Sequence, residues 1–260
     1  DIFPRDFWGS DIFGTSAMPT DITSSNTVFN KAGQMFNTAF GFAKDIGVKT
    51  AIGTELPLGI EAKGPEVGAA WVRGMPPQLQ SRLQSMGKNP SDPAVVKDVY
   101  KGIFERIMKT HHLDYFWLWS YEIWSRYGVN NAQRDAMKND MTRAMEAANE
   151  LNVPFTLGHA GWILGDTDNP ALFDNHLPKD YPFYGLWDEA DGFDEVSAAR
   201  KKWAATWLEE DWGLVQPQLE MHRIYNDVKA AVNTNCHGLI GKGWRTRTMG
   251  ANTHAMKSLF

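Results

Sequence analysis

The amino-acid sequence predicts an α/β protein built on a parallel sheet. From residue 27 onward, segments with the three-and-four apolar spacing of helices alternate with short apolar runs typical of strands. A parallel sheet needs a crossover after every strand, and a helix usually provides it. With 260 residues, 43% of them hydrophobic, the chain can bury one large core. We therefore expect a single domain over residues 1–260.

The elements follow one another in a regular order. The first predicted helix ends at Gly47, and the second opens on Asp92 with a proline in its first turn. A long loop is expected from residue 56 to 90. Helices are predicted at 27–46, 92–109, 131–151 and 215–233, with a short helical stretch at 171–176. Strands are predicted at 48–55, 113–122, 153–162, 181–187, 202–209 and 238–245.

Six strand–helix units are two fewer than a closed (β/α)8 TIM barrel requires. The opening segment, Asp1 to Ser10, resembles a loop from within a protein rather than the start of a domain. We therefore expect the chain to cover about strands three to eight of a barrel that is incomplete at its N-terminal side.

Composition excludes several classes of function. The net charge is −5 and the basic residues are scattered, so no footprint for nucleic acid is present. No apolar stretch approaches the roughly 20 residues of a membrane span. The single cysteine, Cys236, cannot form an internal disulfide, and we expect it to pack as a small apolar residue. The oligomeric state is not determined by the sequence.

Two carboxylates end aromatic-rich strands. Glu122 follows the run Tyr-Phe-Trp-Leu-Trp-Ser-Tyr, and Glu209 follows Trp-Ala-Ala-Thr-Trp-Leu. The carboxyl ends of barrel strands carry the chemistry of such enzymes. Aromatic faces beside polar groups suit a sugar ring. The expected substrate-binding residues lie at or near other strand ends, or inside a strand with small neighbours: Glu55, Trp124, His159, Trp162, Trp187, Trp244 and Arg245.

On strands four and seven of a barrel, Glu122 and Glu209 would face each other across the mouth. A retaining glycosidase needs two carboxyl groups about 5 Å apart. The chain resembles the clan of retaining (β/α)8 glycoside hydrolases that use glutamates at these two positions. Its Tyr121 stands where that clan usually has asparagine. It is also similar to a little-characterised group of carbohydrate-active barrel proteins, through Trp117–Trp124, Gly161–Gly165, Trp207–Asp211 and Gly238–Arg247.

This resemblance implies a hydrolase of oligo- or polysaccharides without a cofactor. Glu209, which we prefer over its neighbour Glu210, would be the nucleophile. Glu122, among tryptophans that disfavour its charge, would be the general acid/base. The resemblance also favours a secreted or periplasmic protein.

Two alternatives use the same residues. Glu55, Glu122, His159 and Glu209 are a possible ligand set for Mn²⁺ or Mg²⁺, as in barrel sugar isomerases and epimerases. The chain can also be a carbohydrate-binding barrel without catalysis.

Overall fold

The computed structural model describes residues 21–58, 75, 77–120, 129–186, 192–208, 220–242 and 250–259. The strands in these ranges are β1 (Ala51–Leu56), β2 (Tyr115–Ser120), β3 (Thr156–Gly161), β4 (Phe183–Gly185), β5 (Lys202–Trp207) and β6 (Gly238–Lys242). The helices are α2 (Ile22–Asp45), α3 (Pro77–Ser85), α4 (Pro93–Thr110), α5 (Asn131–Leu151), α6 (Met221–Asn233) and α7 (Gly250–Leu259).

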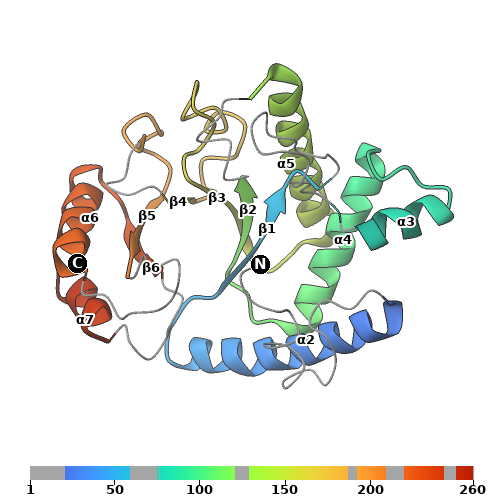
Figure 1. The fold of residues 1–260 in the computed structure, drawn as a ribbon, viewed down its shortest axis with the longest axis horizontal. Helices are drawn as coiled ribbons and strands as arrows, with labels where there is room; N and C mark the ends of the chain where they lie inside the picture. The colour runs from blue at the N-terminus through green and yellow to red at the C-terminus, as the bar shows by residue number, and fades with distance from the viewer. Residues whose placement is uncertain are drawn as a thin grey trace. The chain divides into compact units, whose positions relative to one another are not determined.

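The six strands form one sheet in the order β1-β2-β3-β4-β5-β6 (Figure 1). The pairs β3–β4, β4–β5 and β5–β6 are parallel, with His159 opposite Phe183 and Trp207 opposite Lys242 in their registers. Helices follow β1, β2, β5 and β6, whereas the described residues between β3, β4 and β5 form turns. A parallel sheet whose spatial order follows the chain is the arrangement of consecutive units of a (β/α)8 barrel. The predicted fold class is therefore confirmed.

Some predicted elements differ in extent. The expected loop from 56 to 90 contains α3, and α7 was not predicted. Residues 171–176 form turns instead of a helix. The backbone N–H of Phe173 donates to Leu164 O at 3.0 Å, in an earlier part of the same loop. This N–H is therefore not used in a hydrogen bond of a helix. Strand β4 is limited to three residues, and α6 begins at Met221 rather than near residue 215.

Side-chain caps determine where three helices begin. Asp21 accepts a hydrogen bond from Ser24 N at 2.8 Å, so α2 starts five residues before the predicted boundary. Asp92 accepts from Ala94 N at 2.8 Å and precedes a proline at the first position of α4. Asn130 and Gln133 exchange side-chain to backbone bonds at 2.9 Å, which is a capping box for α5.

The chain divides into two compact units. Unit 1 contains residues 1–52, 75–116 and 142–156, and unit 2 contains the remaining residues. The single domain stays a prediction. In unit 1, Phe104 of α4 packs against Phe116 and Phe155 with ring centroids 5.0 and 5.5 Å apart. Helix α2 lies beside α4 (Figure 1), and Gly33 allows this because a Cβ there would come within 3.1 Å of Thr110.

Unit 2 is held by an apolar cluster and by buried polar groups. Leu208, Ile224 and Val228 form the cluster where α6 covers β5, and α7 packs beside α6 (Figure 1). The Thr206 hydroxyl donates to the Asp227 carboxylate at 2.5 Å in the same interface. These contacts define the side of β5 and β6 that faces helices.

Arg200 is the largest fully buried side chain in unit 2. Its guanidinium forms an ion pair with Asp174 at 2.7 Å and donates to the carbonyl oxygens of Asp174, Leu177, Pro178 and Tyr181. A buried guanidinium is tolerated when its donors are used in this way. Arg200 therefore holds the turns between β3 and β4 together.

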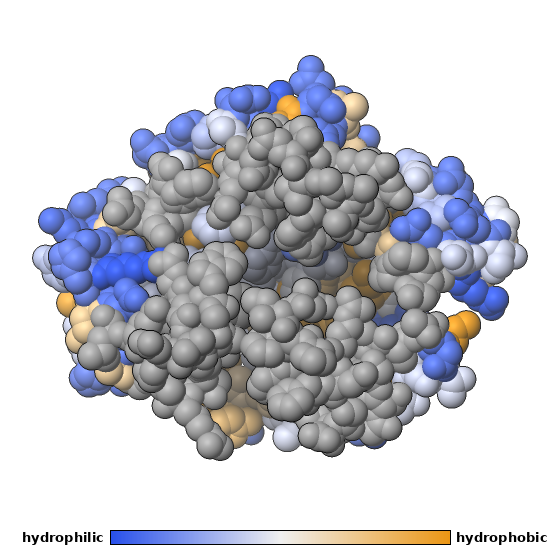
Figure 2. Space-filling model, in the orientation of Figure 1, coloured by the Kyte–Doolittle hydropathy of each residue, from blue (hydrophilic) through white to orange (hydrophobic). Residues whose placement is uncertain are grey.

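Hydrophilic residues dominate the outer sides of α5 and α6 in Figure 2, as expected for helices that pack by one face. None of the described helices combines the length and the apolarity that crossing a bilayer requires.

Candidate functional site

One face of the sheet carries a row of aromatic rings, which we call the tryptophan face. Trp117 of β2 contacts Trp203 of β5 edge-on at 5.3 Å and Tyr184 of β4 at 6.0 Å. Trp119 contacts the same tyrosine at 6.4 Å. Burial raises the pKa of Tyr184, so its phenol stays protonated at neutral pH.

Glycines on neighbouring strands make room for these rings. A Cβ added to Gly158 of β3 would overlap the Trp117 ring, and one added to Gly53 of β1 would lie 2.8 Å from the Trp117 Cβ. Gly53 and Gly158 therefore belong to the tryptophan face. Because successive residues of a strand point to opposite sides, Glu55 of β1 lies on this face as well.

At the carboxyl ends of the strands, the tryptophan face becomes polar. Trp162, directly after β3, stacks on Trp207, the last residue of β5, with centroids 6.3 Å apart and rings inclined by 26°. Lys242 ends β6 opposite Trp207, and its Nζ lies 4.0 Å from the Trp207 ring centroid. An ammonium over an indole face is an attractive cation–π contact. The arrangement combines apolar ring surface with a positive charge.

A buried ion pair supports the segment after Trp162. Arg134 of α5 donates through Nε and Nη2 to the two oxygens of Asp166, at 2.8 and 2.9 Å, and the Asp166 side chain is 0% exposed. Asp166 also accepts from the backbone of Asp168 and Asn169. Asp166 and Asp168 lie in the turns after β3, and the sequence gives no indication of Arg134 as their partner.

His159 has a different environment from the one predicted. It follows Gly158 in β3 and so points away from the tryptophan face. Its ring is 0% exposed and lies between Phe173 and Phe183, at 5.6 and 5.8 Å. Neither ring nitrogen has a hydrogen-bond partner. Burial, with a smaller effect of the Arg200 charge, lowers the pKa of His159 to about 3. Its role in substrate binding stays a prediction.

The predicted metal set does not fit the described residues. Glu55 and His159 lie on opposite faces of the sheet, so the two side chains cannot share one ion. Within the ranges that the structure describes, His, Cys, Asp and Glu form no group of three or more able to hold a metal. We therefore derive no step through a metal.

Several predicted site residues lie outside the described residues: Glu122, Trp124, Trp187, Glu209, Trp244 and Arg245. Glu55 and Trp162 are described, and both lie at the carboxyl ends of strands. The sequence analysis missed Trp207 and Lys242 as site residues. The available signal was the alternation in β6, where Gly238, Ile240 and Lys242 share one side and the lysine comes last.

The chain is similar to known proteins in structure but not in sequence. No family model matches the chain, and no curated protein matches it. One similar solved structure is an L-ribulose 3-epimerase, at 9% identity and a TM-score of 0.44, covering 92% of this chain and 82% of that one. Another is the 3-keto-D-glucoside 4-epimerase from E. coli in its apo form, at 7% identity and a TM-score of 0.45, covering 90% and 92%.

These structures are sugar epimerases and not glycoside hydrolases. The predicted membership of the retaining glycoside hydrolases is therefore wrong, and so is the predicted hydrolase activity. The roles of Glu209 as nucleophile and Glu122 as acid/base depended on that membership and are withdrawn. The physical reason is that acidic residues at strand ends are common to (β/α)8 enzymes of many reaction classes, so the pattern indicates a fold and a location rather than a reaction.

Proposed function

We propose that the protein binds a sugar at the carboxyl ends of the strands, on the tryptophan face, and isomerises or epimerises it. The observation that carries this proposal is the stack of Trp162 on Trp207 with the Lys242 ammonium 4.0 Å from the Trp207 ring centroid. Indole rings suit the apolar C–H surface of a sugar, and an ammonium donates to its oxygens. The two similar solved structures are sugar epimerases as well.

Isomerisation and epimerisation begin with the same step. A base removes the proton from a carbon next to the carbonyl, and the C–H electron pair moves to give an enolate whose oxygen is negative. Delivery of a proton from a donor on the other face of that carbon gives the epimer. Return of the proton to the former carbonyl carbon gives the isomer, when the hydroxyl proton of the first carbon moves to the enolate oxygen so that this hydroxyl becomes the new carbonyl. No oxidant or reductant is consumed. The reaction needs a carboxylate as base and a positive charge near the developing oxygen anion.

Two described residues of the tryptophan face fit these roles. Glu55 is half-buried near the end of β1, and we assign it as the base that removes the proton and, in isomerisation, returns it. Lys242 is assigned to the sugar oxygen, where its charge stabilises the enolate. Trp162 and Trp207 are assigned to the apolar side of the sugar ring.

The proposal is tested by hydrogen exchange into sugars. The protein is incubated in D₂O with a panel of aldoses, ketoses and keto-glycosides, with and without added Mn²⁺, and deuterium incorporation is followed by NMR. Exchange at the carbon next to the carbonyl is expected for the wild type. Glu55→Gln is expected to lose it, whereas Glu195→Gln, a change at an exposed glutamate, is expected to retain it.

Sugar binding is measured separately by calorimetry. Trp207→Ala is expected to weaken binding by about 1–3 kcal/mol, the scale of one large apolar contact. Binding without exchange for every sugar would refute the catalytic assignment and leave a carbohydrate-binding protein. Equal affinity of Trp207→Ala and wild type for a bound sugar would refute the location of the site.

A further inference from the structure

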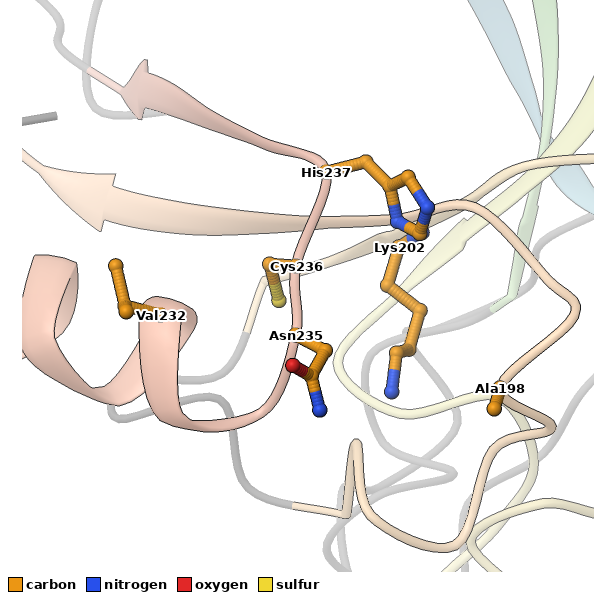
Figure 3. A pocket seen from close by; sticks show the side chains of 6 residues that line it. All are labelled: Ala198, Lys202, Val232, Asn235, Cys236 and His237. Atoms are coloured by element: carbon orange, nitrogen blue, oxygen red, sulfur yellow. The ribbon is translucent and has the colours of Figure 1, made fainter.

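A cavity lies at the amino ends of the strands, where β5 and β6 begin. Its volume is about 500 Å³, within the range of small-molecule sites. The lining residues come from the turn before β5, from β5 itself, from the end of α6 and from the segment between α6 and β6 (Figure 3): Ala198, Lys202, Val232, Asn235, Cys236 and His237. Val232, Asn235 and His237 are exposed, so the cavity opens to solvent.

Lys202 brings a buried positive charge to this cavity. The residue is 5% exposed, and its Nζ donates to the carbonyl oxygen of Phe193 at 2.9 Å. An ammonium has three donors, and that carbonyl is its one acceptor among the described residues. No carboxylate there lies within ion-pair distance of it. Because burying an ammonium without a counter-charge is costly, this position favours an anion.

A neutral donor lies beside the ammonium, and an imidazole lies at the backbone end of the same lysine (Figure 3). Asn235 adopts a left-handed backbone conformation with φ of 55°, and its amide points toward the space that the end of Lys202 enters (Figure 3). The Nδ1 atom of His237 accepts a bond from Lys202 N at 3.4 Å. In a neutral imidazole this leaves Nε2 as the N–H donor. The cavity wall thus offers one cation with an amide donor beside it, and an imidazole farther along the lysine.

We propose that this cavity binds the carboxylate group of a small molecule, with Lys202 as its counter-ion and Asn235 as a hydrogen-bond donor. The charge decides between oxyanions. A carboxylate carries one negative charge, which a single ammonium neutralises, whereas a phosphate dianion would retain an excess negative charge in a partly buried site. The site lies at the amino ends of the strands, so it is separate from the proposed sugar site at their carboxyl ends.

The lone cysteine of the chain gives a specific readout. Cys236 is half-buried in the cavity wall, and no other thiol exists in the 260 residues. Its modification by N-ethylmaleimide, a neutral reagent, is followed by mass spectrometry at increasing sodium acetate. Acetate is expected to slow the modification by at least twofold at saturation. Sodium chloride at the same ionic strength is expected to leave the rate unchanged.

Two variants separate the proposal from an indirect effect. Lys202→Met removes the charge and is expected to abolish protection by acetate. Asn235→Gly removes one donor, suits the positive φ and leaves Lys202 in position. This variant is expected to bind acetate severalfold more weakly. It also tests the proposal if Lys202→Met does not fold. Absence of protection in the wild type, undiminished protection in Asn235→Gly, or stronger protection by inorganic phosphate than by acetate would overturn the proposal.

Discussion

His159 makes a quantitative prediction about acid stability. Its imidazole is fully buried between two phenylalanine rings, without a hydrogen-bond partner, and burial lowers its pKa to about 3. In the unfolded chain a histidine has a pKa of about 6.5. The unfolded state therefore binds a proton below pH 6.5 that the folded state does not bind until near pH 3. Stability contributed by neutral His159 is present above pH 6.5 and is lost as the pH falls through this window.

The magnitude follows from the two pKa values. Between pH 7 and pH 5 the unfolded histidine takes up most of one proton while the folded one takes up almost none, which corresponds to about 2 kcal/mol of lost stability. The result is insensitive to the folded pKa, because any value below about 4 gives nearly the same loss at pH 5. Lys49 lowers the carboxyl pKa of Asp114, and Lys179 and Arg200 lower that of Asp174. These two carboxylates therefore change the stability mainly below this pH range.

The test compares wild type with His159→Leu by urea unfolding at pH 5 and pH 7. Leucine removes the two unpartnered nitrogens, so the variant is expected to be at least as stable as wild type at pH 7. Between pH 7 and pH 5 it is expected to lose about 2 kcal/mol less than wild type. His111 and His176, whose pKa values are also lowered by burial, are common to both proteins and cancel in this difference. Parallel pH dependence of the two proteins would show that His159 is protonated or solvated in the folded state and would refute the reasoning.

Three further changes test how the sheet and its turns are stabilised, each by urea unfolding at pH 7. Gly158→Ala is expected to cost about 1–3 kcal/mol, because its Cβ would overlap Trp117 and lie 2.8 Å from Pro182 O. No loss would show that β3 can shift. Arg200→Leu is expected to cost about 3–5 kcal/mol, since it leaves Asp174 and several carbonyls without their buried donor. A loss under about 1 kcal/mol would contradict that network. Thr206→Val is expected to cost about 1–3 kcal/mol by removing a donor to buried Asp227, and an unchanged midpoint would indicate a solvated carboxylate.

The sequence predicted the periodic elements well because their signals are local. The caps Asp92 and Asn130 and the apolar stripe of α4 lie within a few residues of the structure they produce. The short apolar runs indicated all six strands, and the alternation of strands and helices was enough for the parallel sheet. The prediction was wrong for weakly periodic segments, which include the turns at 171–176 and the helix α7.

The tertiary structure decided the environments of the side chains, because these depend on residues far away in the chain. Small neighbours in β3 suggested space for a ligand at His159, but Phe173 and Phe183 fill that space. Gly158 is small because Trp117, 41 positions earlier in the numbering, needs the room. The cation over Trp207 comes from the end of the neighbouring strand, and the Lys202 cavity forms only where β5 meets the segment before β6. Sequence pattern alone thus determined the fold class, whereas packing between distant segments determined which side chains meet.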